Sequence, residues 1–450
     1  MASTYLTRTF TGSNKTKWTW SAWVKRHSIG SIHPLFHADD GGSNYYTHIS
    51  FHDTDQLFFQ NRWNNTNDGY KITTRMFRDT GAFYHLQFVW DSANATADDR
   101  QIIYVNGERV THFSGSGAVN VAVTQNRHTT INDGYEHRIG RGGTGFNNTS
   151  YADVTLSHVH FADGQALAPT VFGETDATTG EWKIKTSPSF TLGTTGFTIL
   201  KDGNTVTDQS SNSNNWSVGA GTLISTQDCP SNNFATWNNL QKRQAADKLA
   251  TEITPNNDTD ATYAVSTLGA SSGKYYFEFE SNSGNGRASI GMVWSDYATS
   301  QINDNSVPGA NAYSFAFRQY DGVIAINNTT SSYGTNLGWS TTGEVLMMAI
   351  DLDNNLAWFG VDGVWQNSGD PSNGTNGFDW SAVRIAGQPY LVLAGDDTAS
   401  GYGNIQANFG NGYFGTDAIA SEGTNASGIG KFEYDVPTGF TALSTKGLNE

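Results

Sequence analysis

The sequence predicts an all-β protein: two antiparallel β-sandwich (jelly-roll) domains joined by a connecting segment rich in Gly, Ser and Asn. Short apolar runs alternate with polar residues at a period of two, as in half-buried strands. Forty-nine glycines and many Asn and Ser residues interrupt the chain at short intervals, as turns do. At 450 residues the chain is long enough for two or three domains, each with its own core.

The first domain is expected over residues 1–200. In KWTWSAWVKR every second residue from Trp18 to Val24 is apolar, which indicates one buried face. Asn106-Gly107 is a strong signal for a two-residue hairpin turn. The main strands of this domain are predicted at Lys17–Arg26, Phe83–Asp91, Arg100–Val110 and Tyr151–Leu167.

A second strand series predicts a second sandwich over residues 256–415. It begins at GKYYFEFESNS, where Tyr275, Phe277 and Phe279 share one face, and it ends near IQANFG. Residues 201–255 are predicted as the connecting segment, because Gly, Ser and Asn dominate much of it. Residues 416–450 are predicted as a C-terminal tail that packs on the second domain.

Charge is distributed unevenly between the two halves. Residues 1–250 contain 20 Lys and Arg against 21 Asp and Glu, and residues 251–450 contain 6 against 21, so net charges of −1 and −15 make up the total of −16. All eleven histidines lie between His27 and His160. An acidic second half excludes the basic surface that nucleic acid or anionic lipid requires, so we expect neither partner.

Cys229 is the only cysteine, so no intrachain disulfide can form. The N-terminal residues lack the apolar core of a signal peptide, and no apolar run is long enough to span a membrane. We therefore expect no signal-directed export and no membrane insertion.

Residues Asp351 to Asn355, DLDNN, raise the question of a calcium loop. Such a loop needs Gly at its sixth position and Glu at its twelfth, whereas counting from Asp351 gives Leu356 and Asp362. Both flanks are strand-like, and Asn-Asn suits a tight turn. The prediction is a hairpin corner, with no metal and no cofactor.

Enzyme signatures are weak. Glu174 and Glu181 approach the carboxylate spacing of sandwich glycosidases, but a Thr-Thr-Gly turn separates them. His158 and His160 have the spacing of a strand metal site but no convincing third ligand, so we predict exposed strand histidines instead. We expect no catalytic residues and no enzymatic activity.

Aromatic residues in polar segments are the best candidates for function. They lie in GGSNYYTH and NRWNNTNDGY, beside amides and carboxylates. Rings stack on the apolar faces of sugars while amides bond the hydroxyls, although such rings can also simply fix their own loops. The candidate glycan or partner contacts are Tyr45, Tyr46, Trp63 and Tyr70.

Two family resemblances rest on strings of residues in a fixed order. KWTWSAWVKR, IIYVNGERV and DVTLSHVHFADGQAL make the first domain similar to the concanavalin A-like or laminin-G-like jelly-roll group. GKYYFEFE, IGMVW, YSFAF, LAWFGVDG, PYLVLAGD and ANFG, over about residues 262–412, make the second similar to the SPRY group. Its loops differ from those of animal ubiquitin-ligase relatives, so peptide binding is not implied.

The combination of these domains, with DQSSNSNNW and CPSNNFATWNNL between them, resembles structural proteins of marine tailed bacteriophages. The resemblance implies a virion protein made in the host bacterial cytoplasm, namely a tail fibre or tail-associated adhesin that binds host-surface glycan and other virion proteins. It also implies a homo-oligomer, most simply a trimer. Two alternatives remain open: a head decoration or connector protein, and a polysaccharide-degrading enzyme.

Overall fold

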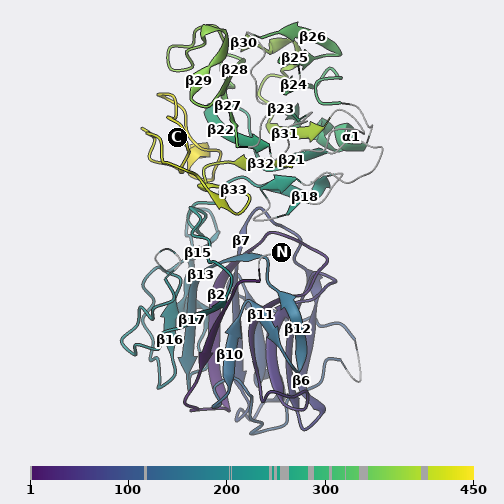
Figure 1. The fold of residues 1–450 in the computed structure, drawn as a ribbon. Helices are drawn as coiled ribbons and strands as arrows, with labels where there is room; N and C mark the ends of the chain where they lie inside the picture. Colours follow the sequence, from purple (N-terminus) through teal and green to yellow (C-terminus); the bar gives the residue numbers. More distant parts are fainter. Residues whose placement is uncertain are drawn as a thin grey trace. The chain divides into compact units, whose positions relative to one another are not determined.

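The computed structural model describes residues 3–115, 119–201, 203, 205–242, 246–247, 251–253, 263–281, 288–303, 307–319, 321–333, 343–396 and 404–449. The chain divides into two compact units, Met1–Ser225 and Thr226–Glu450 (Figure 1). Strands dominate both units, which confirms the predicted all-β class. The helical elements among the described residues are α1 (Ala298–Asn303), η1 (Ala97–Asp99), η2 (Pro169–Val171), η3 (Ser295–Tyr297), η4 (Gln366–Ser368), η5 (Ser381–Val383) and η6 (Gly447–Asn449).

The described part of the first unit contains two large antiparallel sheets. In spatial order, the seven-stranded sheet consists of β17 (Ser217–Ala220), β1 (Tyr5–Thr9), β10 (Glu136–Ile139), β3 (His33–Asp39), β4 (Tyr46–Phe51), β5 (Gln56–Trp63) and β6 (Thr66–Met76). The six-stranded sheet consists of β16 (Phe197–Ile199), β13 (Val154–Asp163), β2 (Lys17–Arg26), β7 (Phe83–Asp91), β8 (Gln101–Val105) and β9 (Glu108–Arg109).

Aromatic side chains from both sheets meet in one core, which makes the unit a sandwich. Trp20 of β2 stacks on Phe36 of β3, and Phe59 of β5 contacts Phe88 of β7 with ring centroids 5.6 Å apart. The alternation from Trp18 to Val24 therefore points inward, as predicted. Asn106 and Gly107 have the positive φ angles of a tight turn, which confirms the predicted hairpin between β8 and β9.

Two hairpins cover the outer faces of these sheets. One is β11 (Arg141–Gly143) with β12 (Phe146–Tyr151), and its Phe146 stacks on His48 of the seven-stranded sheet at 3.7 Å. The other is β14 (Gly173–Thr175) with β15 (Trp182–Ile184), and its Trp182 stacks on His85 of the six-stranded sheet. Outward-pointing residues of the central strands are therefore buried, in contrast to a sheet with one solvated face.

The second unit also has two large sheets among its described residues. One contains, in order, β18 (Trp237–Lys242), β21 (Tyr263–Ala270), β31 (Tyr390–Asp396), β23 (Ala288–Trp294), β24 (Ser314–Arg318), β25 (Val323–Ile326) and β26 (Thr329–Ser332). The other contains β19 (Ala246–Asp247), β20 (Glu252–Ile253), β32 (Ile405–Asn408), β22 (Lys274–Ser281), β27 (Val345–Asp351), β28 (Leu356–Val361) and β29 (Val364–Trp365), with β30 (Phe378–Asp379) beside β28. Phe317 and Phe359 join the two sheets across the core.

The segment 201–255, for which we predicted a connecting role, carries strands of both units. β17 pairs with β1 in the first unit, and β18 pairs with β21 in the second. The predicted domain boundary between residues 255 and 256 lies outside the described residues.

The C-terminal segment, residues 416–449 and yellow in Figure 1, packs on the outer face of β22, β27 and β28. Phe432 contacts Tyr276 with ring centroids 4.9 Å apart. The buried Glu278 carboxylate accepts hydrogen bonds from the backbone N–H groups of Glu433 and Tyr434, both at 2.8 Å. A small two-stranded pair, β33 (Tyr413–Phe414) and β34 (Asp417–Ala418), precedes this contact. No helix in the described part of the chain has the length and apolar character needed to cross a lipid bilayer.

Candidate functional site

Three loops of the first unit meet at one end of its sandwich, and we call their joint surface the end surface. The loops are residues 40–45, the turn at Asn64-Asn65 and residues 126–135. Both turn asparagines have positive φ angles, as a tight hairpin turn between β5 and β6 requires. The N–H of Asn65 donates to the carbonyl of Asn44 at 3.0 Å, and the side chain of Asn61 donates to the carbonyl of His128 at 3.3 Å. These bonds fix the loops relative to one another.

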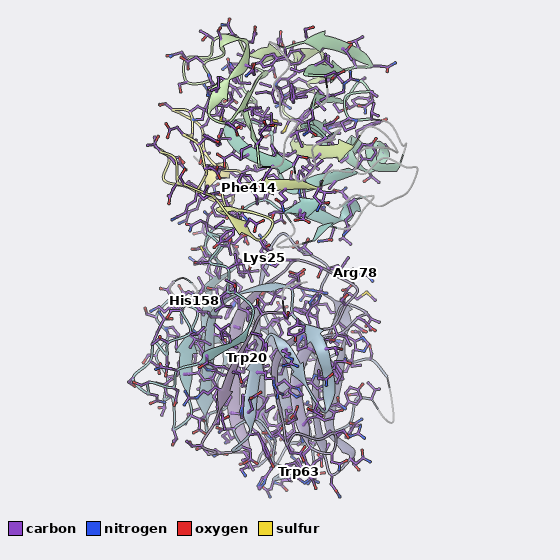
Figure 2. The ribbon with its side chains drawn as sticks, in the orientation of Figure 1. Trp20, Lys25, Trp63, Arg78, His158 and Phe414 are labelled. Atoms are coloured by element: carbon purple, nitrogen blue, oxygen red, sulfur yellow. The ribbon has the colours of Figure 1, made fainter. Side chains whose placement is uncertain are left out.

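Two of the predicted aromatic residues form the centre of the end surface. The rings of Tyr45 and Trp63 have centroids 5.0 Å apart and are nearly perpendicular, at 84°. His128 also contacts the Trp63 indole, with ring centroids 5.9 Å apart and the rings nearly perpendicular. Tyr45 and Trp63 are partly exposed and His128 is exposed, so their rings form an accessible aromatic surface. Figure 2 shows Trp63 at the end of this unit opposite to Arg78.

Two of the cations beside the end surface form ion pairs with carboxylates. Arg127, whose guanidinium lies over the Trp63 ring, is held by Asp68 at 2.5 Å, and Lys15 pairs with Asp133 at 2.7 Å. Partial burial, together with the negative charges of Asp133 and Asp40, raises the pKa of nearby Tyr135. A neutral phenol, amides and exposed rings suit a neutral polar ligand such as a sugar.

The other two predicted residues lie elsewhere. Tyr46 is only 5% exposed, and its hydroxyl donates to Gln60 at 3.3 Å on the outer face of the seven-stranded sheet. Tyr70 lies on the same face, against Phe58. The polar segments that contain these residues are not all loops, since Tyr46, Trp63 and Tyr70 belong to strands.

Arg127, His128 and Tyr135 were not among the residues predicted from the sequence. They stand more than 60 positions after Trp63 in a segment without strand periodicity, and only the folded chain brings them to the end surface. NRHTTINDGY has the same polar and aromatic composition as the segments that were selected, and that composition was the available signal.

A polar cluster lies under the hairpin β11–β12, on the outer face of the seven-stranded sheet. His37 hydrogen-bonds Asp39 at 2.8 Å, and Arg138 contacts the same carboxylate at 3.2 Å. Burial lowers the pKa of His37 and holds that of His48 well below its usual value, so both imidazoles are neutral at pH 7. This cluster fixes the hairpin and is closed to solvent.

Ser21 and His85, on the outer face of the six-stranded sheet, form a contact that resembles a nucleophile–base pair. The Ser21 hydroxyl lies 2.8 Å from Nε2 of His85, and the indole N–H of Trp182 donates to Nδ1 at 3.0 Å. Since Nδ1 accepts, the proton of the neutral imidazole is on Nε2, which therefore donates to the serine. A general base needs the opposite tautomer. Burial also lowers the pKa of His85 to about 3, so this pair is structural.

Neither Glu174 nor Glu181, whose spacing only approaches that of sandwich glycosidases, lies in a buried site. Glu174 is in β14 and Glu181 precedes β15, and both are exposed. Glu174 lies 3.8 Å from Lys185, while the carbonyl of Glu181 closes the turn through the N–H of Asp176. The hairpin geometry gives these carboxylates no enclosed space for a sugar bond.

The two histidines with metal-like spacing are buried, contrary to the exposed positions that we predicted. A β-bulge follows Ser157, and His158 has a positive φ of 51°. His160 hydrogen-bonds Thr198 at 2.9 Å and stacks on Phe172, and burial lowers its pKa to about 3. Among the described residues, no three His, Cys, Asp or Glu side chains are arranged to hold a metal ion.

Asp351 to Asn355 form the predicted hairpin corner between β27 and β28. One oxygen of Asp351 accepts the N–H groups of Asp353 and Asn354, and the other accepts the Asn354 side chain and lies 3.1 Å from Lys274. Asn355 has the positive φ that the turn requires. Both Asp351 oxygens thus have protein partners.

Comparisons with known proteins agree with the fold. A family model described as the Concanavalin A-like lectin/glucanases superfamily matches residues 2–170. The first unit therefore contains a concanavalin A-like domain, as predicted, and such a domain indicates a carbohydrate- or protein-binding role. No curated protein matched the sequence.

Solved structures give weak likenesses. The SPRY domain of human HERC1 is 15% identical, with 35% of this chain and 87% of that chain covered and a TM-score of 0.27. A heptameric SAP-like pentraxin from Limulus polyphemus is 16% identical, with 37% and 72% covered and a TM-score of 0.27. Domains LG4-5 of the mouse laminin α1 chain are 8% identical, with 96% and 92% covered and a TM-score of 0.29. The SPRY-like character of the second domain stays a prediction.

Proposed function

We propose that this chain is a non-enzymatic virion structural protein of a tailed bacteriophage, and that its first unit binds host-surface glycan through the end surface. The observation that carries the proposal is the perpendicular pair of Tyr45 and Trp63, partly exposed and 5.0 Å apart, in a domain of a lectin-like family. The phage assignment rests on the resemblance of the domain combination to marine phage structural proteins.

Recognition would work by stacking and hydrogen bonding. A sugar face would lie on the Trp63 indole, while the side chains of Asn64, Tyr135 and His128 around it would bond its hydroxyls. The loops are already held by backbone hydrogen bonds, so binding costs little loop entropy. As a virion component, the chain would also contact other virion proteins, and a homotrimer is the arrangement we propose for it.

The test is glycan-array binding of the full chain, followed by titration of the best ligand. We expect Trp63→Ala to weaken binding at least about tenfold, which corresponds to about 1.4 kcal/mol, and Tyr45→Ala to weaken it less. The matched control is Tyr104→Ala, because Tyr104 is also a partly exposed aromatic residue but lies on the other sheet.

Three results would count against parts of the proposal. Glycan binding that survives both end-surface substitutions would remove the binding site. Release of reducing sugars from a bound polysaccharide, abolished by Glu174→Gln or Glu181→Gln, would make the protein an enzyme. Density for this chain on the head in cryo-electron micrographs of the particle would make it a decoration or connector protein.

A further inference from the structure

Arg141, in the covering hairpin of the first unit, lies against two tyrosine rings. Its guanidinium carbon is 4.9 Å from the ring centroid of Tyr5 in β1 and 5.5 Å from that of Tyr151 in β12. The ring centroids are 6.2 Å apart and the rings are tilted by 51°. The three side chains therefore form a triangle, with both rings turned toward one cation.

The fold holds each member of this triangle in place. Arg141 and Tyr151 are directly opposite each other in the β11–β12 pairing. Tyr5 is confined by β17, where a Cβ atom on Gly219 would stand only 2.3 Å from its ring. The Nε–H of Arg141 donates to the carbonyl of Asn148 at 3.2 Å, which sets the plane of the guanidinium.

The rest of the guanidinium has no protein acceptor in the described part of the chain. Arg141 forms no ion pair there, and its two terminal nitrogens form no hydrogen bond, although the chain has 42 acidic against 26 basic residues. Arg109 and Arg127 of the same unit, by contrast, each pair with an aspartate. Arg141 thus offers four N–H donors in a fixed planar fork, and it is partly exposed.

A planar fork of this kind matches two oxygens of a carboxylate or phosphate. Around it the hairpin presents exposed amide and hydroxyl side chains, those of Asn147, Asn148 and Thr149. Such groups can both donate to and accept from sugar hydroxyls, whereas a bare anion can use only their donors. The surroundings therefore favour an anionic group that is carried on a sugar.

We propose that Tyr5, Arg141 and Tyr151 form a binding site for an acidic sugar, in which Arg141 binds two oxygens of its carboxylate or phosphate. The rings act as positioning residues, because they fix the cation and shield one side of it from water. This site shares no residue with the end surface, and it extends the binding repertoire of the chain from neutral to acidic sugars.

The experiment is calorimetric titration of the full chain with glucuronic acid, glucose 6-phosphate and glucose. We expect binding of at least one acidic sugar and at least tenfold weaker binding of glucose. Arg141→Gln should reduce the affinity for the acidic sugar at least tenfold. Arg141→Lys should lose a smaller part of the affinity, because it keeps the charge without the fork, and Tyr151→Leu should weaken binding several-fold.

The matched control is Arg75→Gln. Arg75 is an exposed arginine over a single ring, that of Phe77, and it has no ion pair within the described residues. Equal losses in Arg75→Gln and Arg141→Gln would show general charge attraction and overturn the proposal, as would equal binding of glucose. Inorganic phosphate that binds as tightly as glucose 6-phosphate would overturn the sugar assignment. Trp63→Ala should leave acidic-sugar binding unchanged, so the two sites can fail independently.

Discussion

At the scale of single residues, buried carboxylates in this protein serve mainly as acceptors that fix loops. Asp208 accepts the backbone N–H groups of Thr198, Ser210 and Asn214. Asp351 fixes its turn in the same way. A side chain with this role saturates its oxygens within the protein, which explains how an Asp-rich turn can be structural and need no metal.

Asp351→Ala should lower the free energy of unfolding of the second unit by about 1–3 kcal/mol, because two backbone N–H groups of the turn lose the buried, charged acceptor that fixes them. Urea denaturation would measure this, with Asp417→Ala as the control, since Asp417 is exposed. Calcium and a chelator should both leave the melting temperature of the wild-type chain unchanged. A calcium-dependent rise that Asp351→Ala abolishes would restore the calcium-loop interpretation.

At the scale of elements, the hairpin β11–β12 depends on glycines that approach the sheet closely. A Cβ atom on Gly143 would stand 1.8 Å from the Asp39 carboxylate and 2.2 Å from the His37 imidazole. Neither neighbour can move freely, because they are hydrogen-bonded to each other and buried. The close approach is what closes the polar cluster to solvent.

We therefore expect Gly143→Ala to lift the hairpin and destabilise the first unit by about 2–3 kcal/mol, the scale of an overpacked interior site. Limited proteolysis would then cut between residues 141 and 151, and the melting temperature would fall. Gly134→Ala is the control, because a Cβ atom there would have no neighbour within 4 Å. A stable Gly143→Ala variant with a protected hairpin would contradict the packing argument.

Strands and tight turns could be predicted from the sequence, but the covering hairpins could not. The alternation in β2 indicated its inner face correctly, and Asn106-Gly107 indicated a turn that the structure confirms. The other face of β2, with Trp23 and Lys25, is also buried. Period-two patterning distinguishes two faces but does not tell which later segment will cover the outer one.

The same limit applies to the candidate site. Composition selected Tyr45 and Trp63, which do lie together, but it also selected Tyr46, which the hairpin buries. Local sequence carries no information on contacts between distant loops, so Tyr135 and His128 could not be added. Packing between segments distant in the sequence determines which of the aromatic residues in polar segments remain exposed.

At the scale of the whole molecule, the two units contain opposite kinds of buried titratable group. Burial lowers the pKa of His137 and His160 in the first unit to about 3. In the second unit, burial raises the pKa of Glu278 to about 7, and four hydrogen-bond donors only partly offset this. All histidines lie in the first unit, so the sequence itself restricts buried imidazoles to that unit.

We expect these groups to give the units opposite responses to pH. Below pH 6.5 the histidines of the unfolded chain bind protons, whereas the buried histidines of the folded unit stay neutral. Acidification therefore destabilises the first unit, by about 1.4 kcal/mol per pH unit for each histidine. Between pH 7 and 4.5 folded Glu278 holds a proton that the unfolded chain lacks, so acidification stabilises the second unit.

Hydrogen exchange by mass spectrometry at pH 7.5 and 5.5, corrected for intrinsic rates, would measure both responses in one sample. Peptides from β7 should lose protection at the lower pH, whereas those from β27 should keep or gain it. Glu278→Gln should remove the gain in the second unit and leave the first unit's response intact. Parallel changes in both units would contradict the assignment.

The first and last segments of the second unit are adjacent, so its two ends could be joined and new ends opened elsewhere in the chain. Two backbone hydrogen bonds, both of 2.9 Å, hold these segments together. The N–H of Ala235 donates to the carbonyl of Leu443, and the N–H of Thr445 donates to the carbonyl of Asn233. A short linker could therefore join them, and new ends could be opened at the exposed turn of residues 372–374. We therefore expect a circular permutant of the second unit, with its original ends joined by a linker, to keep the same fold.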